Sequence, residues 1–171
     1  MAAFAWLMVT INYVLRSRLG RPAKVTLLEY QRGIRYRRGL ARDEVGPGQH
    51  WSWTGFEKTI FLDTRPIALS YQNQVVTLSD GFTAIYGFSA SVEVRSVRKA
   101  LYSSQAYSQM PAFVLLSCMR TVLSESDSKR VRISQQNISN EITERARTRL
   151  DAAGFVLASF RMGQLGIAAS N

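Results

Sequence analysis

Residues 82–94 read FTAIYGFSASVEV, and their pattern decides the fold class. Successive side chains of a strand point to opposite faces, so an apolar period of two predicts one long strand with a buried and an exposed face. After Arg95 the apolar period changes to 3.6, which is typical of helices. This stretch therefore marks the change from a strand region to a helical region. The expected buried positions are Phe82, Ala84, Tyr86, Phe88, Ala90, Val92 and Val94.

Helices and a returning strand are expected on the C-terminal side. Residues 96–104 can make two helical turns, and Pro111 opens a helix with an apolar stripe that ends at Leu123. A third helix is expected from a Ser134 cap to Gly154, and a final strand after it. Strands followed by helices and a returning strand predict an α+β fold, with an antiparallel sheet packed against helices. The third helix should bury Ile138, Ile142, Ala146 and Leu150, and the last strand Val156, Ala158, Phe160 and Met162.

Strands and turns are expected on the N-terminal side of residues 82–94. Residues 25–30 and 34–39 flank the turn signal Gln31-Arg32-Gly33, so we expect them to pair as a hairpin. Gly46-Pro47-Gly48 is a strong breaker, and residues 58–63 predict the next strand. The sequence thus predicts a strand-rich first half.

The first 15 residues carry no charged side chain and show helical apolar spacing. As a helix they would extend about 22 Å, which is less than the roughly 30 Å of a bilayer's hydrocarbon core. We therefore expect a tilted, interfacial or barely spanning membrane anchor, with a core helix as the alternative. A small-residue cleavage site and a preceding basic stretch are both missing, so a cleaved signal peptide is not expected. The residues predicted to insert are Phe4, Trp6, Leu7, Met8 and Ile11.

A basic stretch follows this apolar segment. The chain has 22 Lys and Arg against 12 Asp and Glu, and residues 16–42 alone hold nine basic residues and one acid. Each Lys or Arg beside an anionic leaflet contributes about 1 kcal/mol of attraction, and positive flanks stay on the cytoplasmic side. Plain solvation and RNA binding are the alternatives, nucleic acid being the less favoured partner. The residues predicted to meet lipid phosphates are Arg16, Arg18, Arg21 and Lys24, so residues 1–24 form an anchor and residues 25–171 the domain.

Several motifs occur in an order and spacing that resemble the SPFH family, also called Band 7, which includes the stomatins, prohibitins, flotillins and the bacterial HflK/HflC-type proteins. They are Gly46-Pro47-Gly48-Gln49-His50, Leu62-Asp63-Thr64-Arg65, the segment 76–83, Lys99-Ala100-Leu101-Tyr102 and the segment 118–123. The likeness covers about residues 25–165. It implies a membrane-associated scaffold that self-assembles, as a homo-oligomer or with related chains, and organises neighbouring membrane proteins or lipid microdomains.

Self-association is expected to use the domain itself, because the 171 residues contain no heptad array. The sheet edge near residues 82–94 and the helices at 96–123 and 141–149 are the candidate surfaces. Charges of both signs on the last helix could complement a neighbouring copy, although ordinary intrahelical pairs would look the same. The predicted oligomer contacts are Glu141, Glu144, Arg145 and Arg149.

Catalysis is not expected from this sequence. His50 is the only histidine and Cys118 the only cysteine, so neither a metal cage nor a disulfide can be built from them. We expect His50 to stabilise its turn and Cys118 to lie in the core. No nucleotide-binding, hydrolase or zinc-protease motif occurs, and no cofactor or metal is predicted. The alternative function is a soluble basic module that binds RNA or an acidic protein.

Overall fold

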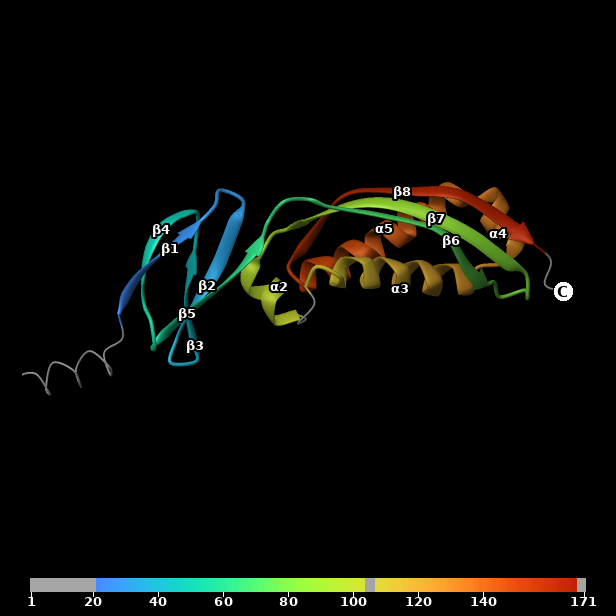
Figure 1. Cartoon of the computed structure of the whole chain (residues 1–171). Helices are drawn as coiled ribbons and strands as arrows, with labels where there is room; N and C mark the ends of the chain where they lie inside the picture. Colours follow the sequence, from blue (N-terminus) through green and yellow to red (C-terminus); the bar gives the residue numbers. More distant parts are fainter. Residues whose placement is uncertain (1–20, 104–106, 169–171) are drawn as a thin grey trace, which may run out of the picture. The chain divides into compact units, whose positions relative to one another are not determined.

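The computed structural model describes residues 21–103 and 107–168, and the chain divides into two compact units between Thr64 and Arg65 (Figure 1). We call the part before this division unit 1 and the part after it unit 2. Antiparallel strands and helices are both present, which confirms the predicted α+β class. The predicted N-terminal anchoring helix lies outside the described residues.

The described part of unit 1 consists of strands that form two antiparallel sheets. One sheet pairs β1 with β4, and the other has the order β3-β2-β5. The breaker at Gly46-Pro47-Gly48 separates β3 from β4, as the sequence predicts. The strands are β1 (Pro22–Leu27), β2 (Gln31–Arg37), β3 (Leu40–Val45), β4 (Gly48–Trp53) and β5 (Glu57–Asp63).

The predicted hairpin between residues 25–30 and 34–39 is wrong. β1 pairs with β4, whereas β2 pairs with β3 and β5. The true hairpin turn is Arg38-Gly39, where φ is 51° and 82°. Two consecutive positive φ values are those of a type I′ hairpin turn, whose backbone twist matches that of its strands. Gln31-Arg32-Gly33 instead form the start of β2, and residues 28–30 turn the chain from one sheet to the other.

A close approach of two strands fixes Gly33 in β2. A Cβ added at this position would lie 2.7 Å from the carbonyl oxygen of Ile60 and 3.3 Å from the Cβ of Phe61 on β5. Only glycine fits there without moving β5. Buried apolar side chains around this point come from β1, β2, β3 and β5, and they are Leu27, Ile34, Val45 and Leu62.

Unit 2 places α3 and α5 on one side of a three-stranded antiparallel sheet, as Figure 1 shows. The sheet order is β6-β7-β8, so the first and last strands of the unit flank the middle one. The elements are β6 (Ile67–Thr77), β7 (Thr83–Val94), α2 (Val97–Ser103), α3 (Met110–Ser124), α4 (Ser128–Ile133), α5 (Gln135–Ala152) and β8 (Phe155–Ala168).

The core of unit 2 lies between this sheet and its helices. Along β7 every even residue from Ala84 to Val92 is buried and every odd one is more exposed, which confirms the predicted period of two. Phe82 precedes the strand and is exposed. On α5 the predicted apolar stripe is confirmed, because Ile138, Ile142, Ala146 and Leu150 are fully buried. Gly154 ends this region with φ of 88°, as its stop signal predicts.

The predicted face of the last strand is wrong in its first half. Phe155 and Leu157 are buried, whereas Val156 and Ala158 are exposed. The cause is a shift of register, since Val92 pairs with Leu157 but Ser91 pairs with Ser159. The extra residue, Ala158, reverses which side chains face the helices.

A short helix, α4, was not anticipated. Asp127 caps it by accepting a hydrogen bond from the backbone N–H of Arg130 at 3.1 Å. Asp80, from the turn between β6 and β7, accepts a second one from the N–H of Ser128 at 2.8 Å. Hydrogen bonds from Ser128 hold the pKa of Asp80 below its ordinary value, the Ser128 side chain being the largest cause and the Ser128 backbone the next. The β6–β7 turn is thus fastened to the start of α4.

Candidate membrane-binding and self-association surfaces

Two tryptophans and a lysine share one exposed face of the β1–β4 ribbon. Lys24 lies directly opposite Trp51, and Pro22 directly opposite Trp53, so their side chains are on the same side. Trp51 is 60% exposed and Trp53 46% exposed. The Lys24 Nζ lies 5.2 Å from the centroid of the Trp51 ring, within range of a cation–π interaction. We call Lys24, Trp51 and Trp53 the tryptophan face.

The backbone around this face is fixed by hydrogen bonds at the end of the ribbon. The hydroxyl of Thr54 donates to the carbonyl oxygen of Arg21 at 2.6 Å and accepts from the Arg21 N–H at 3.0 Å. The N–H of Trp53 donates to the carboxylate of Glu57 at 3.0 Å. These contacts hold the two tryptophans on a rigid strand pair and place Arg21 at its end.

The predicted lipid contacts are only partly within the described residues. Arg21 and Lys24 lie at the start of β1, and the structure brings Lys24 against Trp51. Phe4, Trp6, Leu7, Met8, Ile11, Arg16 and Arg18 lie outside the described residues. Among the residues that the structure does describe, no helix is long and apolar enough to cross a bilayer.

The basic stretch after Lys24 is interleaved with carboxylates once it is folded. In the β2–β3 hairpin Arg35 lies opposite Asp43, and Ile34 lies opposite Glu44. The Arg37 Nε lies 3.9 Å from the carboxylate of Glu57 on β5. The fold therefore pairs Arg37 with a carboxylate of a neighbouring strand and places Asp43 and Glu44 on the strand beside β2.

The predicted oligomer contacts on α5 are engaged within the chain. Arg145 donates to Glu141 at 2.8 Å and to Glu125 at the end of α3 at 3.1 Å. Glu141 also accepts from Arg130 of α4 at 3.0 Å. This network joins three helices, so Glu141 and Arg145 hold unit 2 together whether or not they also meet another copy.

The other two predicted contacts differ in orientation. Arg149 donates to the hydroxyl of Ser117 on α3 at 3.2 Å, on the same flank of α5 as Arg145. Glu144 pairs with Arg147 at 3.1 Å, and both side chains are well exposed. The structure therefore groups Glu141, Arg145 and Arg149 along the flank toward α3 and leaves Glu144 apart from them.

His50 and Cys118 have the structural roles that the sequence predicts. The Nε2 of His50 lies 2.9 Å from the carbonyl oxygen of Gly46, so a ring N–H donated there closes the turn before β4. Cys118 is buried in α3, and burial raises the pKa of its thiol, with Arg149 and Arg145 acting in the opposite direction. A raised pKa disfavours the thiolate that a nucleophile would need.

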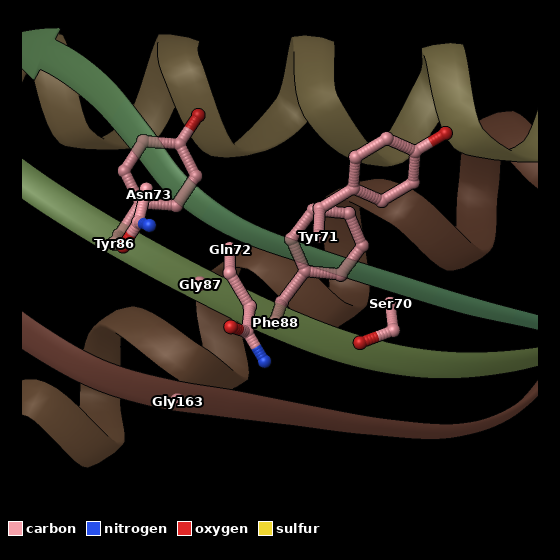
Figure 2. A pocket seen from close by; sticks show the side chains of 8 residues that line it. All are labelled: Ser70, Tyr71, Gln72, Asn73, Tyr86, Gly87, Phe88 and Gly163. Atoms are coloured by element: carbon pink, nitrogen blue, oxygen red, sulfur yellow. The ribbon is translucent and has the colours of Figure 1, made fainter.

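A hollow of about 310 Å³ lies where β6 is irregular, next to Gly87 and Gly163 (Figure 2). Tyr71 and Tyr86 extend toward α3 there, while Ser70 and Gln72 extend away from it. The hollow offers hydroxyl and amide groups but no His, Cys, Asp or Glu. Such a lining can form hydrogen bonds but supplies no pair of nucleophile and base. No cluster of potential metal ligands occurs within the described parts of the chain.

Sequence reasoning missed the tryptophan face, although its signal was present. Trp51-Ser52-Trp53 places two tryptophans on the same side of any strand, because side chains alternate. The pairing of β4 with β1, which brings Lys24 to Trp51, could not be seen because the wrong hairpin was expected.

The fold defines an α+β protein with two antiparallel sheets in unit 1 and a helix-covered sheet in unit 2. The model of the SPFH domain / Band 7 family matches residues 25–170, which is most of the chain. The chain therefore belongs to the SPFH domain / Band 7 family, and the resemblance predicted from its motifs is confirmed. Comparison with curated proteins gave no match.

Proposed function

We propose that this chain is a non-enzymatic, membrane-associated scaffold of the stomatin and prohibitin type. In this role it self-associates and organises neighbouring membrane proteins or lipid microdomains, with its domain on the cytoplasmic side of the membrane. Family membership supports the general class. The single observation that carries the membrane part is the tryptophan face, with Trp51 and Trp53 exposed beside Lys24.

The tryptophan face has the chemistry of the membrane–water boundary. Tryptophan is enriched there because its ring is largely apolar while its N–H can still reach water or a headgroup. A lysine beside it adds attraction to anionic lipid of about 1 kcal/mol. Arg21 lies shortly before Lys24 in the sequence, and the predicted anchor at residues 1–15 precedes both. Together they would hold unit 1 against an anionic leaflet at several points.

Vesicle flotation of the full-length chain tests this proposal. We expect the protein to float with vesicles that contain anionic phospholipid and to float less well with neutral ones. Replacing both Trp51 and Trp53 by serine should weaken binding at least about tenfold, equivalent to roughly 1.4 kcal/mol. The matched control is Phe113→Ser, because Phe113 is a 70% exposed aromatic on α3 of unit 2. Binding to neither vesicle type would overturn the membrane proposal.

The same flotation assay also tests the predicted anchor at residues 1–15. The double variant Leu7→Asp and Ile11→Asp should release the protein from vesicles, because charged side chains do not insert into hydrocarbon. Full retention of this variant would assign residues 1–15 to the core instead. Salt-sensitive binding to RNA without binding to vesicles would favour the soluble basic module.

A further inference from the structure

Among the described residues, no helix of unit 2 covers one face of that unit's sheet. α3 and α5 pack against the opposite side, where the even residues of β7 are buried. We call the uncovered side the open face. Apart from the apolar Val75, Ile85 and Val156, it carries mainly Ser, Thr, Ala, Gly and Gln. Solvated sheet faces usually carry long charged side chains, and their scarcity here lets another surface approach closely.

The two charges on the open face, Glu93 of β7 and Arg161 of β8, have no partner of opposite sign in the described residues. Glu93 is exceptional for that reason. The other carboxylates of unit 2 each accept a hydrogen bond, often in an ion pair: Asp80, Glu125, Asp127, Glu141, Glu144 and Asp151. The helical side of the unit thus satisfies its acids, whereas the open face leaves one acid and one base exposed.

Glu93 and Arg161 are too far apart along the sheet to pair within one copy. Arg161 lies opposite Ser89, and Glu93 is four residues further along β7, opposite Val156. Four residues of a strand extend about 14 Å. Halfway between the two charges lies the pair Ser91 and Ser159, both with small side chains.

We propose that the open face is a contact surface for a second copy of this chain. The two sheets stack face to face about a two-fold axis that runs between them, across the strands, at Ser91. Turning the second sheet end for end about this axis brings the Ser89–Arg161 pair of one copy over the Glu93–Val156 pair of the other. Each Arg161 then meets a Glu93, and the two ion pairs form symmetrically, as a closed two-fold interface requires. Ser91 of one copy faces Ser91 of the other, where small side chains allow close stacking.

This inference deepens the self-association proposed above by naming its surface, and charge reversal tests it. The full-length chain is solubilised in mild detergent and its mass is measured across concentrations. Glu93→Arg alone and Arg161→Glu alone should each weaken association at least about tenfold, because like charges then meet. The double variant Glu93→Arg with Arg161→Glu should recover association to within about threefold of the native chain.

Two controls separate this surface from others. Arg132→Glu makes the same charge change on an exposed part of α4 and should leave association unchanged. Glu144→Arg changes a contact residue predicted from the sequence, on the outer side of α5, and should also leave association unchanged. If the native chain associates but the open-face variants match it, the open-face inference is overturned and the scaffold proposal stands. A native chain that is monomeric throughout overturns both.

Thiol cross-linking tests the position of the proposed two-fold axis directly. Cys118 is the only cysteine of the sequence and is 1% exposed. A cysteine introduced at Ser91 would therefore be the thiol that reacts. A short bis-maleimide should cross-link Ser91→Cys to a dimer. Thr148→Cys, exposed on α5, should not be cross-linked by the same treatment, because the proposed contact does not bring two copies of α5 together. Cross-linking of Thr148→Cys without Ser91→Cys would contradict the proposed geometry.

Discussion

The two units of this chain use their apolar side chains differently. In unit 2, large side chains such as Leu115, Met119 and Leu150 are fully buried between helices and sheet. In unit 1, where the described residues form only strands, Trp51 and Trp53 stay exposed. Leu40 and Phe61 are exposed there as well. Unit 2 also exposes large apolar side chains, Phe113 and Ile133 among them, but among the described residues only unit 1 places two exposed tryptophans beside a lysine on one strand pair. We therefore expect unit 1 to supply the membrane contact and unit 2 to supply the helix-covered core.

Two spectroscopic signals can separate the units. All three tryptophans of the chain precede Thr64, so tryptophan fluorescence reports unit 1. The described helices all lie in unit 2, so the helical circular dichroism signal reports that unit.

The largest effect is expected from Leu150→Ala on α5. This side chain is fully buried, and removing it leaves a cavity, so the free energy of unfolding should fall by about 2–5 kcal/mol. Thermal unfolding followed by helical circular dichroism measures the loss. Thr148→Ala, exposed on the same helix, should change the stability by less than about 0.5 kcal/mol. Equal effects of the two variants would contradict the described core.

A smaller effect, confined to unit 1, is expected from Gly33→Ala. The new Cβ would lie 2.7 Å from the Ile60 carbonyl oxygen, so β2 and β5 must separate at a cost of about 1–3 kcal/mol. Hydrogen exchange of the β2 and β5 amides should speed up, while that of α5 should not. Gly46→Ala is the matched control, because nothing lies within 4 Å of its added Cβ. Unchanged exchange in Gly33→Ala would show that the strands are not this close.

A modest effect is expected from Arg145→Ala. Its two ion pairs, with Glu141 at 2.8 Å and Glu125 at 3.1 Å, are partly exposed, so solvent screens them and the loss should be about 0.5–1 kcal/mol. Chemical denaturation monitored by circular dichroism gives the value, and added salt should reduce it. If Arg145→Ala lowers association much more than stability, this side chain belongs to an oligomer contact after all.

The smallest effect concerns Asp80 and appears only in acid. Its pKa is lowered in the folded chain, so its carboxylate stabilises the fold above the unfolded pKa, about 4, and the contribution is lost as pH falls through the lower folded value. Asp80→Asn should therefore flatten the decline of the melting temperature in this acid range. Melting curves of both proteins at a series of pH values measure the difference. Identical declines would contradict the bonds from Ser128.

Local patterns in the sequence predicted unit 2 better than unit 1. The period of two in β7 and of 3.6 in α5 follows from burial on one side, and both are confirmed. Strand partners depend on contacts distant in sequence, so the pairing of β1 with β4 could not be read from turn residues alone. The same holds for the extra residue Ala158, which reverses the face of β8. The Glu141–Arg145 pair was predictable from spacing, but its partners Glu125 and Arg130 come from other helices.

The most direct test of the account is whether Trp51 and Trp53 enter a lipid surface. Replacing Trp6 by phenylalanine leaves these two as the only tryptophans of the full-length chain. When anionic vesicles are added, their emission should shift to shorter wavelength, and lipids brominated near the headgroup should quench it. Emission that stays unshifted and unquenched at saturating anionic lipid would contradict the claim that unit 1 binds membranes through its tryptophan face.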